Sequence, residues 1–218
     1  MKTLTDLFDY SYCINLDRRT DRWEECQQEF SKWNLSNVHR ISAIDKNNIP
    51  KDFPDVYKNV PHRNLGCIGL ILTNIQILKY AQEQNFSQIL IMEDDVYFTP
   101  EVNNIESLIS YVPEDWDLLY IGGNHNYHNK GHRAQPIPVN EKVLKLQHTF
   151  TTHCVGIKSH MYNVLLDHLS TLANPLDVIY VGIQKAYNVY GIHPSVAKQR
   201  AGFSDIENQV RDYNNWII

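Results

Sequence analysis

Short apolar runs that end in polar or small residues recur along the first half of the chain. They predict strands that are each followed by a loop, at residues 12–19, 38–45, 89–95 and 117–124. Residues 19–35 repeat apolar side chains at three- and four-residue steps, and residues 68–84 are apolar over several turns, so both predict helices. Strands that alternate with helices favour an α/β fold with a mainly parallel sheet flanked by helices.

The pattern is weaker after about residue 125. Residues 124–142 are polar and predict a loop, whereas 145–158 predict one or two strands. Residues 159–172 predict an amphipathic helix with Ser159 as its cap, and residues 175–199 a helix followed by a strand. No internal repeat or linker-like tract divides the sequence. We therefore expect a single domain over residues 1–218.

The composition of the chain excludes some classes of binding partner and of cofactor. A formal charge of -5 and a pI near 6.0 argue against a nucleic-acid-binding protein. The four cysteines have no CxxC pair, so we expect reduced thiols and no zinc site. The first residues lack the apolar stretch of a signal peptide, and no apolar run is long enough for a transmembrane segment. These features favour a cytoplasmic protein, and they leave a homodimer open.

Three adjacent carboxylates, Glu93, Asp94 and Asp95, follow the apolar strand at 89–92. In α/β sheets ligands bind outside the carboxyl ends of the strands, so this triplet lies where a ligand is expected. Adjacent carboxylates repel one another, and oxygen ligands of this kind favour Mg²⁺ or Mn²⁺. A divalent cation between carboxylates and a diphosphate is one interpretation. The other is that these side chains cap the following loop or pair with nearby arginines.

Arg18, Arg19 and Arg22 follow the first predicted strand directly. Guanidinium groups hydrogen-bond phosphates, carbonyl oxygens or carboxylates in a bidentate manner, so a ligand site is one interpretation of this loop. A solvated turn, in which Asp17 or Asp21 pairs with these arginines, is the alternative.

An ordered set of segments resembles glycosyltransferase family 25, which includes bacterial lipooligosaccharide galactosyltransferases and collagen hydroxylysine glycosyltransferases. The opening strand and arginine loop are similar in YCINLDRRTDRW, followed by SAIDK. The family's glycine-spaced helix start is similar to GCIGLILTN, its acidic metal motif to ILIMEDDVYFTP, and the following strand to DWDLLYIGG. The remaining segments are matched by THCVGIKSHMYNVLL, PLDVIY and HPSVAKQRAGFSDIEN. The set covers nearly the whole chain.

The resemblance implies a GT-A-type, Rossmann-like fold and an inverting hexose transfer assisted by Mn²⁺ or Mg²⁺. The donor would be a UDP-sugar carrying galactose, glucose or an N-acetylhexosamine. The acceptor would be a hydroxyl of a glycan or of hydroxylysine in a collagen-like chain. Residues 1–123 would bind the nucleotide sugar, and residues 124–218 would bind the acceptor and close the site.

Roles for individual residues follow from the same resemblance. Glu93 and Asp95 would hold the metal, with Asp95 as the first choice of direct ligand and Asp94 at the donor. His193 would be a distal metal ligand or a diphosphate contact, with a structural histidine as the alternative. The remaining donor contacts would be Asn15, Arg18, Arg19, Arg22, Asp45, Thr73 and Asn74. The family commonly has Ser-His where this chain has Thr73-Asn74, so sugar preference does not transfer.

Inversion requires a base that takes the acceptor hydroxyl proton. Asp177 and Asp205 are the candidates, and we favour Asp177, which leaves Asp205 as a metal or donor contact. A helix N-cap is the alternative role for either residue. His125, His128 and His132 lie among residues that do not favour a helix, so an acceptor-facing loop is a better interpretation than a zinc site.

Two other functions fit the same features. A metal-dependent nucleotidyltransferase or phosphohydrolase would also use clustered carboxylates, although no GKS- or GKT-type phosphate loop is present. A catalytically silent domain that binds a sugar nucleotide or a glycan is the second alternative.

Overall fold

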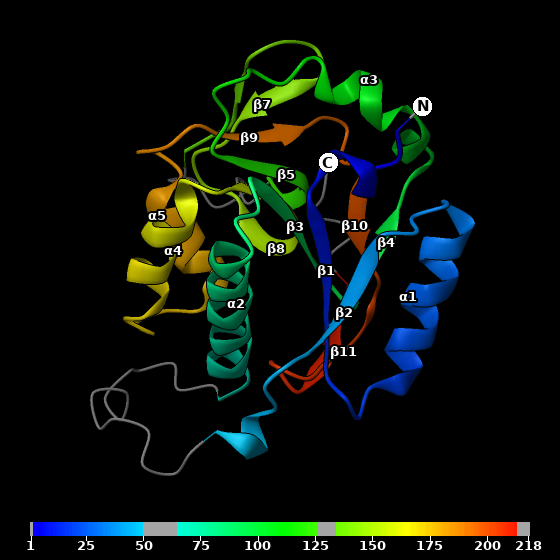
Figure 1. Cartoon of the computed structure of the whole chain (residues 1–218), viewed down its shortest axis with the longest axis vertical. Helices are drawn as coiled ribbons and strands as arrows, with labels where there is room; N and C mark the ends of the chain where they lie inside the picture. The colour runs from blue at the N-terminus through cyan, green and yellow to red at the C-terminus, as the bar shows by residue number, and fades with distance from the viewer. Residues whose placement is uncertain (1, 50–64, 126–133, 213–218) are drawn as a thin grey trace.

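The computed structural model describes residues 2–49, 65–125 and 134–212. Its main strands are β1 (Tyr10–Asn15), β2 (Val38–Ser42), β3 (Gln88–Glu93), β5 (Leu118–Asn124), β6 (Ile137–Pro138), β7 (Val143–Lys145), β8 (Phe150–Lys158) and β9 (Val189–Ile192). Within the described residues these eight form one sheet in the order β2-β1-β3-β8-β5-β9-β7-β6 (Figure 1). Two small ribbons are formed by β4 (Val96–Phe98) with β10 (Ala197–Gln199), and by β11 (Gly202–Ser204) with β12 (Gln209–Arg211).

The large sheet is mixed. β1 is parallel to both of its neighbours, β2 and β3, and β5 is parallel to β9. β8 lies between β3 and β5 and is antiparallel to both, and β7 is antiparallel to β6 and β9. The predicted α/β class is confirmed, and the mainly parallel sheet is corrected to a mixed one. An apolar run predicts a strand but carries no sign of its direction, so the reversal of β8 was not visible in the sequence.

Helices cover both faces of the sheet. They are α1 (Thr20–Lys32), α2 (Leu65–Glu83), α3 (Ile105–Ile109), α4 (Met161–Leu169) and α5 (Leu176–Ile183), with 3₁₀ turns at Thr5–Leu7, Lys46–Asn48 and Pro100–Asn104. α2, α4 and α5 lie on one side, and α1 and α3 on the other (Figure 1). Successive side chains of a strand point to opposite faces of the sheet, so one strand contributes to both layers. In β3, Ile89 and Ile91 pack with the first group of helices, and Leu90 and Met92 pack with the second.

The predicted helices at 19–35 and 68–84 correspond to α1 and α2, and residues 145–158 contain the strand β8 and only the last residue of β7. α4 begins at Met161 with His160 at its N-cap position, so Ser159 is not the cap. All four cysteines are free thiols. Across the described ranges, no helix is both long and apolar enough to span a bilayer. Residues 126–133, which include His128 and His132, lie outside the described residues.

Candidate active site

A large open cavity of about 1390 Å³ lies where β1, β3 and β5 end and β8 begins. Most of the polar residues predicted from the sequence line this cavity, namely Arg18, Arg22, Asp45, Glu93, Asp94, Asp95, Asp177 and Asp205. They come from segments far apart in the chain, and the parallel strands bring them to one edge of the sheet. The expected ligand edge is therefore a real concavity lined by acids and arginines.

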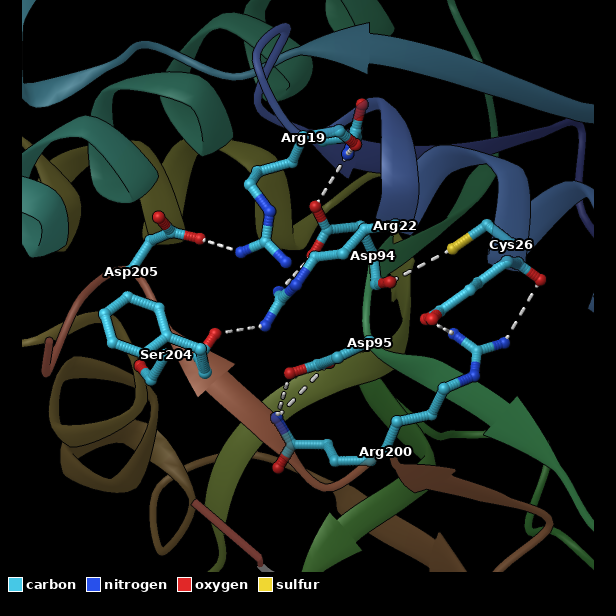
Figure 2. A network of polar contacts seen from close by, with 12 residues as sticks. Arg19, Arg22, Cys26, Asp94, Asp95, Arg200, Ser204 and Asp205 are labelled. Atoms are coloured by element: carbon cyan, nitrogen blue, oxygen red, sulfur yellow. Dashed lines mark hydrogen bonds and ion pairs between the residues drawn. The ribbon is translucent and has the colours of Figure 1, made fainter. Parts of the chain in front are cut away.

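Asp94 is the neutralised member of the carboxylate triplet. Arg22 Nη1 donates to Asp94 Oδ1 at 2.6 Å, and Asn15 Nδ2 donates to Oδ2 at 2.7 Å (Figure 2). Asn15 is 1% exposed, and its own amide oxygen accepts from Arg40 Nε at 2.8 Å. Asn15 is not among the residues lining the cavity. Asn15 is a buried support for Asp94, because every polar atom of its amide is used within the protein, and its expected donor contact stays a prediction.

Glu93 and Asp95 are held by neutral donors. Thr152 Oγ1 donates to Glu93 Oε1 at 2.9 Å, and Gln199 Nε2 lies 3.3 and 3.4 Å from the two Asp95 carboxylate oxygens. Burial raises the pKa of Glu93 to about 8, with a further contribution from the Asp95 charge. Burial also raises the pKa of Asp95 to about 6, although the positive charge of Arg22 opposes the shift. Both side chains carry negative charge only at a cost, and a nearby cation would relieve it.

The oxygen atoms at this site provide some, but not all, of the ligands that a hard divalent cation needs. The carboxylate oxygens of Glu93 and Asp95 are ligands that Mg²⁺ and Mn²⁺ prefer. Within the described ranges, no group of three or more His, Cys, Asp or Glu residues is arranged to hold a metal ion. Two carboxylates would therefore share an ion with diphosphate oxygens or water, as Mg²⁺ sites commonly do.

His193 is not brought to the carboxylates. It follows β9, its backbone N–H donates to the Lys142 carbonyl at 2.8 Å, and it does not line the cavity. Its expected role as a distal metal ligand stays a prediction, and this geometry favours the structural alternative. Two strands, β8 and β5, separate β9 from β3 in the sheet, and this separation cannot be seen in the sequence.

The arginine loop after β1 fastens the β11–β12 hairpin over the cavity. Arg18 bridges Asp45 Oδ2 at 2.8 Å and Asp205 Oδ1 at 2.7 Å. Arg19 pairs with Asp205 (Figure 2) and, at 2.8 Å, with Asp21. Arg19 does not line the cavity and forms a structural bridge here, so its expected donor contact stays a prediction. The alternative in which the loop pairs with its own aspartates holds for Arg19 and Asp21.

The two candidate bases have opposite environments. Burial raises the pKa of Asp177, although backbone hydrogen bonds with Thr151 and Val178 oppose the shift. Burial alone would also raise the pKa of Asp205, but hydrogen bonds from Arg18 and Arg19 outweigh it and hold that pKa below its usual value. Asp177 lies in the first turn of α5, where its Oδ1 accepts from the Val178 N–H at 2.9 Å. Of the two, Asp177 has the environment of a base.

Thr73 and Asn74 are buried in the middle of α2 and do not line the cavity. Thr73 Oγ1 donates to the Gly69 carbonyl at 2.8 Å and accepts from Ile44 N–H at 2.9 Å. Asn74 Nδ2 donates to the Leu70 carbonyl at 2.9 Å. Their expected contacts with the donor stay predictions, and the helix does not favour them, because α2 begins at Leu65 and places both residues more than two turns inside.

Thr152 and Gln199 are site residues that the sequence analysis did not assign. Both lie in segments that carry the family resemblance, but nothing in their spacing shows which carboxylate each one contacts. His125 differs from its expected place in an acceptor-facing loop. It is 2% exposed, and its Nδ1 lies 3.0 Å from Thr149 Oγ1.

Comparison with known proteins identifies the family. The sequence profile of glycosyltransferase family 25 (LPS biosynthesis protein) matches residues 8–173, well over half of the 218 residues. The chain belongs to glycosyltransferase family 25. A family 25 member with this mixed sheet has the GT-A-like fold that the resemblance implied.

Relatives with curated names agree with this assignment. A protein of Acanthamoeba polyphaga mimivirus named as a glycosyltransferase is 24% identical over 149 residues, which are 66% of this chain and 44% of that protein. Procollagen galactosyltransferase 1-A of Xenopus laevis is 26% identical over 131 residues, 53% of this chain and 21% of that one. The chain thus spans less than half the length of either relative.

Among solved structures, a glycosyltransferase involved in glycosylation of the major capsid of PBCV-1 superposes with a TM-score of 0.41 and 11% identity. That match covers 74% of this chain and 64% of the other. A197 from STIV gives a TM-score of 0.44 and 12% identity, and the match covers 96% of each chain. Both likenesses are too distant to bear on function.

Proposed function

We propose that this family 25 protein transfers a hexose from a UDP-sugar to an acceptor hydroxyl, with inversion and with a divalent cation held at Glu93 and Asp95. One observation carries the proposal. The cavity presents two half-buried acids, Glu93 and Asp95, that have no salt-bridge partner among the described residues, whereas their buried neighbour Asp94 is paired with Arg22. Family membership supports the nucleotide-sugar donor.

Different residues of the cavity would have different roles in such a transfer. Glu93 and Asp95 would hold the ion, which when bound neutralises the diphosphate leaving group. Arg18 lines the cavity and its side chain is 45% exposed, so it is available to the donor as well as to Asp45 and Asp205.

Asp177 would accept the proton of the acceptor hydroxyl as that oxygen attacks the anomeric carbon. Its raised pKa makes it a stronger proton acceptor than an ordinary aspartate. Asp205 would instead keep the hairpin closed over the donor, because its charge is already committed to Arg18 and Arg19.

The names of the procollagen galactosyltransferase relatives make galactose the first sugar to test, and collagen-type hydroxylysine the first acceptor beside glycans. The experiment offers UDP-galactose, UDP-glucose and UDP-N-acetylglucosamine with Mn²⁺ to both acceptor classes. It measures UDP release and, by NMR, the anomeric configuration of the product. We expect inversion, and a fall in kcat of about 100-fold or more for Asp177→Asn.

Asp205→Asn is the comparison variant. We expect it to raise the donor KM with kcat largely kept, because it loosens the hairpin without removing the base. A product with retained configuration would contradict the mechanism. Nucleotide turnover without an acceptor would favour the phosphohydrolase alternative, and donor binding without any turnover would favour the silent domain.

A further inference from the structure

The start of β8 contacts two of the acidic side chains that face the cavity. Thr152 Oγ1 donates to Glu93 Oε1 at 2.9 Å. The backbone of the preceding residue, Thr151, makes a hydrogen bond with the Asp177 carboxylate. Two adjacent residues of one strand therefore reach the proposed metal ligand and the proposed base.

Thr151 has an uncommon backbone conformation. Its φ is 61°, in the left-handed region that β-branched residues rarely adopt. Such a conformation persists only where surrounding contacts hold it. The Thr151 hydroxyl oxygen accepts from Asn124 N–H at 3.1 Å and lies 3.2 Å from His153 Nδ1. These two contacts hold Thr151 in place from the end of β5 and from within β8.

His153 fixes the direction of this hydrogen-bond chain. It is fully buried, and burial lowers its pKa to about 4, so the ring is neutral at neutral pH. Nε2 lies 3.2 Å from the Ala197 carbonyl oxygen, which can only accept, so Nε2 carries the proton and Nδ1 is an acceptor. The Thr151 hydroxyl therefore donates to Nδ1. The chain runs from Asn124 N–H through Thr151 and His153 to Ala197.

The same chain joins three segments of the site. Asn124 ends β5, Thr151 lies in β8 and Ala197 begins β10, the strand whose Gln199 lies against Asp95. The packing at this junction is tight. A Cβ added at Gly122 would lie 2.1 Å from the Ala197 carbonyl oxygen and 2.5 Å from His153 Nε2. A shift of His153 would therefore move backbone atoms and not only a side chain.

We propose that His153 and Thr151 are positioning residues for the transfer reaction. Their hydrogen bonds hold Thr151 in its left-handed conformation, and this conformation orients the Asp177 and Glu93 carboxylates toward the cavity. Both residues act through the two carboxylates. The inference rests on the proposed function, because it gives the carboxylates their roles.

The test compares Thr151→Val, which keeps the shape but lacks the hydroxyl, with Thr151→Ser, which keeps the hydroxyl. Thr151→Ala is the second hydroxyl-free variant should the valine protein fail to fold. Thr149→Val is the matched control. Thr149 is buried and, like Thr151, contacts a histidine Nδ1, that of His125 at 3.0 Å, but it contacts no carboxylate of the site in the described residues.

The first readout is the crystal structure of each variant. We expect residue 151 to leave the left-handed region and to lose its contact with Asp177 in the valine or alanine protein, and to keep both in the serine protein. A valine or alanine protein that keeps φ near 61° and the contact with Asp177 would overturn the inference. This readout needs no activity, so it is independent of the proposed function.

The second readout is turnover, with hydrolysis of UDP-galactose in Mn²⁺ as the probe. We expect kcat to fall about 10-fold or more for Thr151→Val, while Mn²⁺-dependent binding of UDP changes by less than about threefold. Thr151→Ser and Thr149→Val should remain within about threefold of the unaltered protein. An equal loss in Thr149→Val would show a merely structural effect and overturn the inference. Failure of the unaltered protein to bind UDP with Mn²⁺ would overturn the proposed function instead.

Discussion

The three adjacent carboxylates have different environments, because each one contacts different side chains. Asp94 has an arginine and an amide as partners, whereas Glu93 and Asp95 have neutral donors and raised pKa values. The sequence shows the triplet but not this division, because Arg22 and Asp94 are 72 positions apart and meet only in the fold. The partner of each carboxylate was therefore left open, while the location of the triplet at a ligand edge was predictable.

Removing the cation beside Asp94 should destabilise the protein. Arg22→Met leaves a largely buried carboxylate without its counter-charge, so we expect the free energy of unfolding to fall by about 3 kcal/mol. Urea unfolding at neutral pH measures the change. Arg211→Gln is the control, because its pair with Glu207 is more exposed and should contribute less than about 0.5 kcal/mol. Equal losses for the two variants would contradict the assigned difference in burial.

Stability should fall as pH rises above about 6.5 in the absence of metal. The folded pKa of Glu93 is raised to about 8, so in this range the folded state binds more protons than the unfolded state. Below about pH 6.5 the lowered pKa of His153 opposes this trend, because there the unfolded state binds the extra proton. We expect a loss on the order of 2 kcal/mol between about pH 6.5 and about pH 8.5, measured by urea unfolding in EDTA.

Glu93→Gln should flatten this pH dependence, because the amide does not ionise. Glu106→Gln should leave it unchanged, because Glu106 is exposed and, within the described part of the chain, its carboxylate accepts one hydrogen bond, from the backbone N–H of Lys2. Stability that rises over the same pH range would show that burial does not penalise the charge of Glu93.

Whole elements position the donor end of the cavity. α2 packs on the loop after β2 so closely that a Cβ added at Gly69 would lie 2.1 Å from the Ile44 carbonyl oxygen. Thr73 Oγ1 bonds Ile44 N–H from the next turn of the helix. Residues on both sides of this contact, Asp45 and Leu70, line the cavity. The apolar pattern predicted the helix α2, and the sequence shows two glycines near its start. The contact of Gly69 with the Ile44 carbonyl could not be inferred from that pattern.

Gly69→Ala should push α2 and this loop apart. We expect a loss of about 2 kcal/mol in the free energy of unfolding and weaker binding of UDP, measured by thermal unfolding and calorimetry. Gly182→Ala in α5 is the matched control, because a Cβ there would meet nothing within 4 Å. It should be neutral or stabilise by up to about 1 kcal/mol. A neutral Gly69→Ala variant would show that the loop yields easily.

The topology of the sheet brings the charged residues of the site together. β1 and β3 lie side by side and end at the same edge, so the arginine loop and the acidic triplet meet there. This part could be predicted, since strands separated by helices tend to run in one direction. The reversal of β8 could not, and it is β8 that supplies Thr152 to Glu93 and a backbone contact to Asp177.

The closing hairpin also depends on the whole fold. Asp205 lies 186 positions from Arg19, yet the two side chains pair in the fold. Sequence reasoning assigned both residues to the ligand, because charged residues at a ligand edge are as suited to a diphosphate as to each other. Only the three-dimensional arrangement shows that they already neutralise one another.

The most direct test of the central claim is calorimetric titration of UDP into the protein with Mn²⁺ and again with EDTA, with GDP as the comparison nucleotide. We expect UDP binding that requires the metal, is stronger than GDP binding, and is lost in Asp95→Asn. The exposed Asp167→Asn should bind as the unaltered protein does. UDP binding that is unaffected by EDTA and by Asp95→Asn would contradict a cation site at the acidic triplet. Absence of binding to either nucleotide would contradict the donor assignment itself.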